Sequence, residues 1–401
     1  MKARCLRLFC LSLLGTACLL VTALPSNAAP VFARKYGFNC TMCHSNFPRL
    51  NDFGQRYRSN GYQLPGREDD EQTVLEGPAP IAGRTSAGYN YDKFTNDAEA
   101  EDINQFQLNG LDLLSGGVIA RNIGYFAIYV PEMKASSGVA GQTGALEMAS
   151  VVFSNIGRTN TNVRVGRFEG AFVPFSAKRI LTFSPYEIYD VAGPGGLALS
   201  DTQTGIELTG GRRCGLRYAV GWTDGSASNR SGDSPADLYV RLAKVFGEGE
   251  GQTAGHRLGL VGYWGDARPA DETMTDTGRH SVDRWGFDAA LNFREWSLGL
   301  QYMQGSDDAA LWDGSGDYDI SGGFAEALYL PATNLVGIAR YDWVNTPDGP
   351  GSDIKRWTLG GRYYFADNLA LHVEYSHRTQ DIVEPPQRKE EFFTTRLDWA
   401  F

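Results

Sequence analysis

Two cysteines three positions apart, followed at once by a histidine, form the segment with the clearest chemistry: Cys40, Cys43 and His44. In a helical turn, thiols at this spacing lie on one side and can reach the two vinyl groups of a single porphyrin. The adjacent imidazole can then bind the porphyrin iron. This is the attachment pattern of a c-type haem, and we predict one covalently bound haem c with His44 as its iron ligand.

Two other uses of the motif compete with this prediction. A redox-active dithiol is expected in a thioredoxin-like βαβ context, which the sequence around Cys40 does not provide. A zinc site needs a fourth ligand beside Cys40, Cys43 and His44, and the N-terminal segment contains no further cysteine or histidine. Haem attachment is therefore the use of the motif that best explains the spacing of the two cysteines and the histidine.

The residues that follow suit a small haem-binding module. Pro48 is expected to open a helix as its first residue, and its carbonyl is a candidate acceptor for the outer ring N–H of His44. Leu50, Phe53 and Tyr57 follow a helical spacing and are expected to cover a porphyrin face, or to form the core of an ordinary amphipathic helix. The predicted cofactor-binding set is Cys40, Cys43, His44, Pro48 and Leu50.

Basic residues surround the motif, and between positions 30 and 66 they face a single acid, Asp52. Their excess positive charge suits the carboxylates of a haem, or belongs to an ordinary solvated surface. The basic residues are Arg34, Lys35, Arg49, Arg56 and Arg58.

The sixth ligand of the iron is not evident from the motif. Between Pro30 and Glu76, His44 is the only histidine, and the only methionine, Met42, lies inside the motif. The position is expected to be empty, to hold water or an unusual ligand, or to be filled from a distant part of the chain. The distant candidates are Met133, Met148, Met274, Met303, His256, His280, His372 and His377.

Composition restricts the rest of the chain to a turn-rich β protein. The chain has 401 residues, 42% of them hydrophobic, and its 48 glycines exceed the usual share without a collagen-like period. After residue 25 no run of about 18 apolar residues remains, so we expect no transmembrane helix in the mature protein. The formal net charge of −10 argues against a nucleic-acid partner.

The amino terminus is predicted to be a secretory signal peptide. A basic start is followed by an apolar run from Leu8 to Leu24 and by a small-residue cleavage site at 26–28. Of the cysteines that remain, only Cys40 and Cys43 are close together, so no disulfide framework is expected. The predicted organisation is a signal peptide at 1–28, a monohaem cytochrome c module at 29–67, a linker at 68–82 and a β-barrel at 83–401.

Beyond the linker, segments of about ten residues alternate in hydrophobicity between turn residues, which is typical of a transmembrane β-barrel. Long loops after odd-numbered strands and tight turns after even-numbered ones favour such a barrel over a soluble β-sandwich. We predict an all-β fold, a 16-stranded antiparallel barrel with strands at 83–94, 103–114, 117–130, 143–156, 162–172, 204–211, 215–223, 235–246, 256–265, 283–293, 295–304, 320–330, 335–345, 355–366, 369–378 and 391–401.

The last of these strands alternates most clearly. Phe393, Leu397 and Trp399 share one face, whereas Arg396 and Asp398 share the other, which fits apolar side chains toward lipid and polar side chains toward water. The same parity predicts an inward direction for Arg340, Asp342, Arg362, His372, Glu374 and Arg378. Tight turns are predicted at 115–117, 211–214, 293–295, 331–334 and 367–368.

Acidic residues cluster in the predicted external loops. Their carboxylates would concentrate hard cations such as ferrous iron, or form an ordinary solvated surface. They are Asp97, Glu99, Glu101, Asp102, Asp271, Glu272, Asp276, Asp307, Asp308, Asp313, Asp317 and Asp319.

The N-terminal part of the chain resembles the fused cytochrome–porins of the bacterial outer membrane, which include the monohaem iron oxidases. The resemblance covers about a tenth of the chain and rests on the segments 32–34, 40–44, 48–51 and 60–62. It implies a protein embedded in outer-membrane lipid of a Gram-negative bacterium. It also implies one-electron transfer between an extracellular donor or acceptor, classically ferrous iron, and periplasmic c-type cytochromes.

The apolar band of an outer-membrane barrel is about 25 Å tall, so one haem can help electrons across only if it lies inside the barrel or at its mouth. We therefore expect the N-terminal module to plug the barrel from the periplasmic side. The alternative function is a diffusion porin with a structural or sensory haem plug. A further possibility is peroxidase-like chemistry, with a residue such as His372 near an open iron position.

Overall fold

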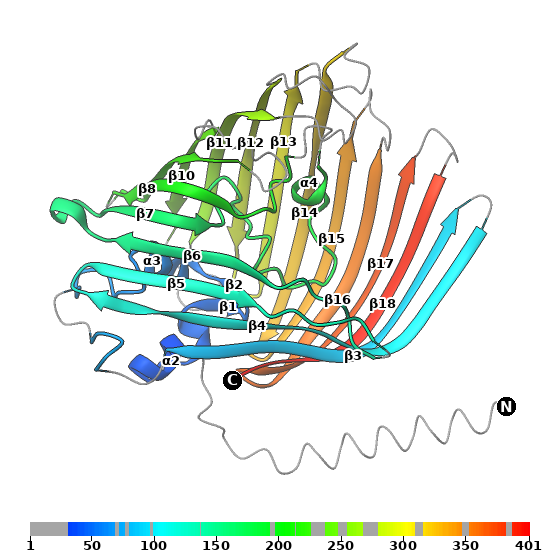
Figure 1. Cartoon of the computed structure of the whole chain (residues 1–401), viewed down its shortest axis with the longest axis horizontal. Helices are drawn as coiled ribbons and strands as arrows, with labels where there is room; N and C mark the ends of the chain where they lie inside the picture. The colour runs from blue at the N-terminus through cyan, green and yellow to red at the C-terminus, as the bar shows by residue number, and fades with distance from the viewer. Residues whose placement is uncertain are drawn as a thin grey trace.

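A computed structural model describes residues 31–68, 72–76, 80–96, 99–136, 138–192, 197–212, 214–225, 237–247, 255–267, 280–308, 316–346, 353–381 and 387–401. Within these ranges, sixteen antiparallel strands form a closed barrel, which the pairing of β18 with β3 completes (Figure 1). The predicted all-β, 16-stranded antiparallel barrel is confirmed. The predicted signal peptide at 1–28 lies outside the described residues.

The barrel strands follow one another around the wall in chain order, and each pairs with the strands before and after it. They are β3 (Ile81–Asn96), β4 (Glu99–Ala120), β5 (Ile123–Val130), β6 (Ala145–Phe153), β7 (Thr161–Phe168), β8 (Gln203–Gly211), β9 (Leu216–Thr223), β10 (Asp237–Phe246), β11 (His256–Ala267), β12 (His280–Asn292), β13 (Trp296–Asp307), β14 (Tyr318–Ala332), β15 (Leu335–Asn345), β16 (Ile354–Ala366), β17 (Leu369–Asp381) and β18 (Gln387–Ala400).

The two faces of the wall have opposite chemistry. Arg340 and Asp342 of β15 are buried, whereas Trp357 and Leu359 of β16 are 58% and 56% exposed. Because side chains alternate along a strand, such strands place charged groups inside the barrel and apolar groups outside. Such an arrangement suits a wall whose outer face contacts lipid. Among the described residues, no helix is long and apolar enough to span a membrane.

The predicted inward set lies on the inner face. Arg340, Asp342, Arg362, His372 and Glu374 are buried, and Arg378 contacts a segment inside the barrel. In β18, Arg396 is buried while Leu397 is 42% exposed, as the alternation predicts.

One predicted turn is wrong. The turn predicted at 115–117 lies instead at 121–122, where Asn122 adopts a φ of 60°, and β4 continues to Ala120. Gly116 and Gly117 serve a different purpose, because a Cβ at Gly116 would lie 2.8 Å from the ring of Phe32. A Cβ at Gly117 would lie 2.5 Å from Val74. The glycines admit the N-terminal part of the chain against the wall.

The predicted acidic external loops are also partly wrong. Since β3 and β4 are joined at 97–98, Glu99, Glu101 and Asp102 belong to β4, and Asp319 likewise lies in β14. Asp307 ends β13 and is buried, 2.6 Å from Arg284. The strands extend farther than predicted, so acidic residues that were expected in loops lie within strands. Asp97, Asp271, Glu272, Asp276 and Asp313 lie outside the described residues.

A long connection between β7 and β8 folds into the barrel. We call residues 169–202, of which 193–196 are not described, the inner loop. It carries the short helix α4 (Glu187–Asp190), which packs on β14 and β15 (Figure 1). Tyr186 stacks on Phe324 of β14 with ring centroids 4.1 Å apart. The buried aromatic core of the protein therefore lies in the lumen, between the inner loop and the wall.

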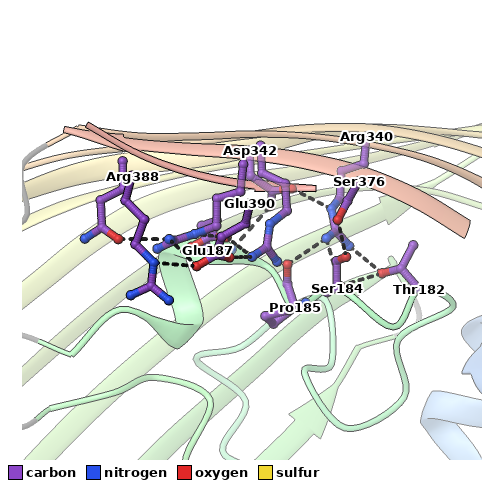
Figure 2. A network of polar contacts seen from close by, with 12 residues as sticks. Thr182, Ser184, Pro185, Glu187, Arg340, Asp342, Ser376, Arg388 and Glu390 are labelled. Carbon is purple, nitrogen blue, oxygen red and sulfur yellow. Dashed lines mark hydrogen bonds and ion pairs between the residues drawn. The ribbon is translucent and has the colours of Figure 1, made fainter. Parts of the chain in front are cut away.

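Buried charged groups of the wall bind the backbone of the inner loop. The carboxylate of Glu374 accepts hydrogen bonds from the N–H groups of Phe183 and Ser184, at 2.6 and 2.8 Å. The guanidinium of Arg340 donates to the carbonyls of Ser184 and Pro185, at 2.9 and 2.6 Å (Figure 2). These contacts satisfy polar groups that would otherwise be buried without partners.

Residues 31–68, which we call the N-terminal segment, lie at the end of the barrel that carries the carboxyl terminus (Figure 1). They contain α2 (Val31–Tyr36), the 3₁₀ turn η2 (Cys40–Met42), β1 (His44–Asn46), β2 (Arg49–Leu50) and α3 (Asp52–Ser59). Gln63 bonds Asn122 and Ser154 in two short connections of the wall, at 3.1 and 2.9 Å. The N-terminal segment thus contacts the short-turn end of the barrel.

Pro48 does not open a helix, contrary to the prediction. It lies between β1 and β2, and α3 begins at Asp52 with Asn51 as its N-cap, whose side chain accepts a hydrogen bond from the N–H of Gly54 at 2.9 Å. The side-chain oxygen of Asn51 satisfies a backbone N–H of the first helical turn, so the helix begins after Asn51 and not at Pro48.

Candidate functional site

The cysteine motif is a compact turn held against α3. In η2, the N–H of Cys43 donates to the carbonyl of Cys40 at 3.2 Å, which brings both cysteines onto one turn. Asn51 holds that turn by two hydrogen bonds. Its backbone N–H donates to the carbonyl of Cys43 at 2.9 Å, and its side-chain amide donates to the carbonyl of Met42 at 3.1 Å. A Cβ on Gly54 would lie 2.1 Å from the carbonyl oxygen of Cys43, so only glycine lets α3 approach the motif this closely.

The imidazole of His44 is oriented by the backbone of Pro48. Its Nδ1 lies 3.0 Å from the Pro48 carbonyl, the acceptor that the sequence suggested. A proton held on Nδ1 leaves Nε2 as the lone-pair nitrogen, which is how metal-binding histidines are commonly fixed. Burial lowers the pKa of His44 to about 4, although the Pro48 hydrogen bond acts in the opposite direction. The ring is therefore neutral at pH 7, the form that binds a metal.

Cys40, Cys43 and His44 open onto a cavity of about 170 Å³ with a mainly apolar and aromatic lining, which we call the aromatic cavity. Pro48, Leu50, Phe53 and Tyr57 line it as well, so the predicted residues come together in one place. The lining also includes Phe32, Tyr36, Phe38, Phe47, Tyr62, Leu114, Phe126 and Ile128. Two thiols, one oriented imidazole and flat apolar walls are the set of groups that a covalent porphyrin requires.

The basic residues divide between two places. Of the five that the sequence singled out, Arg58 lines both the aromatic cavity and a second cavity, and Arg49 and Arg56 line the second cavity alone. The side chain of Arg34 is not described. Lys178 and Arg179 of the inner loop also line the aromatic cavity, and neither was predicted from the sequence. In the sequence, Lys178 and Arg179 are only a pair of basic residues in a long connection between two strands. The sequence does not indicate that this connection folds into the barrel, so their place at the cavity could not be predicted.

The two competing uses of the motif find little support in the geometry. Burial, followed by the nearby charge of Asp367, raises the pKa of the Cys40 thiol to about 12, and burial raises that of Cys43 to about 11. Thiols held in the protonated form exchange disulfides slowly. Among the described residues, no group of three or more His, Cys, Asp and Glu side chains is arranged to hold a metal ion.

The described lining of the aromatic cavity includes no methionine and no histidine other than His44. His372 lies on β17 with its Nε2 3.1 Å from Glu374, away from the motif, so the structure does not support a distal acid–base role for it. Met133, Met148, Met303, His256 and His377 do not line the cavity either. Met274 and the side chain of His280 are not described.

A second cavity, of about 490 Å³, lies between α3, the inner loop and the wall from β7 to β13, and we call it the arginine cavity. Nine arginines and three carboxylates are among its described lining residues. The arginines are Arg49, Arg56, Arg58, Arg164, Arg179, Arg212, Arg217, Arg241 and Arg257, and the carboxylates are Asp52, Glu169 and Glu207.

Several of these arginines share a carboxylate. Asp288, which is buried behind the lining, accepts from Arg241 and Arg257, both at 2.9 Å. Arg49 of the N-terminal segment forms an ion pair with the buried Glu326 of β14. Counting Asp288 and Glu326 as partners, nine arginines still face five carboxylates, so the described surroundings of the cavity carry excess positive charge.

Comparison with known proteins decides what the barrel is. The family model described as phosphate-selective porin O and P matches residues 81–401. The chain belongs to this porin family. Its barrel therefore resides in the outer membrane of a Gram-negative bacterium, with its apolar outer face in contact with lipid. The match begins after the Cys40–His44 motif, so it does not bear on the motif's chemistry.

Solved structures agree with the porin fold. An anion-selective porin from Comamonas acidovorans shares 12% identity, covers 80% of this chain and 99% of its own, and superimposes with a TM-score of 0.57. The outer-membrane channel DcaP of Acinetobacter baumannii, also 12% identical, covers 80% and 97% with a TM-score of 0.58. Salmonella typhi OmpF, 11% identical, covers 80% and 97% with a TM-score of 0.54. A search of curated proteins finds no match.

Proposed function

We propose that this porin admits small anions and that its N-terminal segment carries one covalent haem c as a plug of the barrel. The excess of arginine over carboxylate in the arginine cavity is the observation that carries the first part. Clustered positive charge within low-dielectric walls concentrates anions and repels cations, which is how charged pores select. The names of the family, phosphate-selective, and of the Comamonas structure, anion-selective, support the same sign of selectivity.

Reconstitution in planar lipid bilayers tests the anion preference. Under a salt gradient, the wild-type pore should give a reversal potential on the anion-selective side. Arg212→Gln with Arg217→Gln should move it toward zero, because both side chains line the arginine cavity and Asp52 keeps Arg56 as a partner at 3.0 Å.

Lys355→Gln with Lys389→Gln is the matched control for this experiment. It removes the same charge at two exposed positions of β16 and β18 outside both cavities, and should leave the reversal potential unchanged. A wild-type pore that prefers cations would contradict the proposal.

One-electron transfer across the outer membrane is the second candidate function, favoured by the arrangement of Cys40, Cys43, His44 and Pro48 beside the aromatic cavity. The two thiols would hold the porphyrin covalently, and His44, oriented by Pro48, would bind its iron. A bound haem supplies a one-electron centre that cycles between ferrous and ferric iron. Its position at the short-turn end, which faces the periplasm in such barrels, would suit exchange with periplasmic c-type cytochromes. An extracellular metal such as ferrous iron would be the other partner.

Haem content and haem reduction separate these functions. The wild type should carry one haem that resists acid–acetone extraction, and Cys40→Ser with Cys43→Ser should carry none while the barrel still folds. In proteoliposomes, rapid reduction of the haem by ferrous iron on the loop side would support electron transfer. A redox-silent haem together with solute flux would support the plugged diffusion porin. A wild-type protein without covalent haem would refute the haem assignment in both.

A further inference from the structure

Three cations from two separate parts of the chain meet at the aromatic cavity. Arg58 comes from α3, whereas Lys178 and Arg179 come from the inner loop, more than a hundred residues later in the chain. The thiols of Cys40 and Cys43 open onto the same cavity. An apolar cavity with basic groups in its lining suits a ligand that is flat and apolar but carries carboxylates.

The three cations are incompletely neutralised. Glu169 is 2% exposed, and it pairs with Arg179 and, at 3.7 Å, with Arg58. One carboxylate therefore serves two guanidinium groups. Lys178 pairs with Glu147 of β6 at 2.9 Å, and both side chains remain partly exposed. These three cations thus face two carboxylates, which leaves room for a further anionic group.

Arg179 has a structural role in the inner loop, because it pairs there with the buried Glu169, whereas the side chain of Lys178 pairs with Glu147 of β6. The loop is already fixed farther along by Glu374, which binds the N–H groups of Phe183 and Ser184. Arg340 binds the carbonyls of Ser184 and Pro185 (Figure 2). The aromatic core of the loop adds the stacking of Tyr186 on Phe324. The loop has more deeply buried anchors than the partly exposed Lys178. The ammonium group of Lys178 has three N–H donors, so its ion pair with Glu147 leaves donors for a ligand.

We propose that Lys178 and Arg179 of the inner loop, together with Arg58 of α3, bind the carboxylates of the haem c at Cys40 and Cys43. The inference rests on the haem attachment proposed above and adds where the carboxylates are bound. Charge-assisted hydrogen bonds from guanidinium and ammonium groups are the usual way in which proteins hold such carboxylates. One consequence is that the haem joins the N-terminal segment to the inner loop, so that it helps to hold the segment in the barrel.

The midpoint potential of the haem tests the assignment. Cations beside the carboxylates disfavour the ferric state, which carries one more positive charge, so their removal should lower the potential. Lys178→Gln should lower it, and Lys178→Gln with Arg179→Gln should lower it further. Lys178→Arg, which keeps the charge, should restore it. The exposed variants Lys355→Gln and Lys355→Gln with Lys389→Gln remove equal charge elsewhere and should leave the potential unchanged.

Two further measurements distinguish a failure of the proposed haem attachment from a failure of the proposed carboxylate binding. The mass of the intact mature protein reports haem attachment, and heat-modifiable mobility in gels reports barrel folding. A wild-type protein without haem would refute the proposed function and this inference with it. A haem-loaded, folded Lys178→Gln variant whose potential equals that of the wild type would overturn the inference and leave the proposed function standing. The single variant keeps the Arg179–Glu169 pair, so it tests the idea even if the double variant does not fold.

Discussion

Two segments occupy the barrel, and they are attached in different ways. The inner loop is held by buried charged groups of the wall, such as Arg340 and Glu374, and by an aromatic core. The N-terminal segment is held by scattered contacts, many of them at turns, which include the ion pair of Arg49 with Glu326 and the buried hydrogen bond of Gln63 with Ser154. The inner loop also lies within the residues that match the porin family, whereas the N-terminal segment precedes them.

This difference teaches that the inner loop contributes to the stability of the barrel, while the N-terminal segment is attached to the barrel from outside the residues that match the porin family. Buried charges raise the energy of any state in which they lose their partners. Strength of attachment should therefore follow how deeply the partners are buried, and substitutions can test that order.

The largest effect is expected from Arg340→Ala. This change leaves Asp342 buried without its partner at 2.7 Å and removes the hydrogen bonds to Ser184 and Pro185. The free energy of unfolding of the whole barrel should fall by about 3–5 kcal/mol, measured by urea unfolding in micelles. Lys355→Ala, on the outer face, should change it by less than about 0.5 kcal/mol. Equal effects of the two variants would contradict the comparison.

A smaller and more local effect is expected from Arg49→Ala. Glu326 loses its ion pair but keeps its hydrogen bond with the hydroxyl of Tyr186 at 3.0 Å. The free energy of opening of the N-terminal segment should therefore fall by about 3 kcal/mol. Hydrogen exchange should show faster exchange in residues 31–68, with the unfolding of the barrel little changed. If the barrel loses as much stability as the N-terminal segment, the two are one cooperative unit and the comparison fails.

The smallest effect is expected from Glu68→Gln. The carboxylate of Glu68 accepts hydrogen bonds from the side chain of Asn60 at 2.9 Å and the N–H of Gly66 at 3.0 Å, just after α3. Burial alone would raise the pKa of Glu68, but these hydrogen bonds outweigh it and the pKa lies below its ordinary value. The variant should weaken the protection of the N-terminal segment by about 1 kcal/mol at pH 7.

The pH dependence of that effect has a definite sign. Because the pKa of Glu68 is lowered on folding, its contribution is present above the ordinary carboxyl pKa and is lost as the pH falls through the lowered value. Hydrogen exchange at pH 7 and pH 3 should show the difference between wild type and variant shrinking in acid. Glu76→Gln, at an exposed carboxylate that bonds Thr73, is the control and should not alter the segment. A difference that persists undiminished at pH 3 would refute the role of Glu68.

The wall of the barrel and the cysteine motif could be predicted from the sequence alone. Alternation with a period of two follows from strand geometry, so it was enough to place Arg340 and His372 on the inner face. The spacing of Cys40, Cys43 and His44 is likewise local chemistry, since one turn of chain brings them together. The hydrogen bond from His44 to Pro48 spans four residues and is predictable on the same local grounds.

The residues that fill the lumen could not be predicted from the sequence, because they depend on how distant parts of the chain pack together. Gly116 and Gly117 suggest a turn in the sequence, but contacts with Phe32 and Val74 explain them. The inward fold of the inner loop brings Lys178 to the aromatic cavity, and the curvature of the wall gathers arginines from α3, the inner loop and several strands into the arginine cavity. The physical reason is that the alternation of a strand depends only on neighbouring residues. A cavity is instead lined by residues that are distant in the chain, and these come into contact only when the barrel closes.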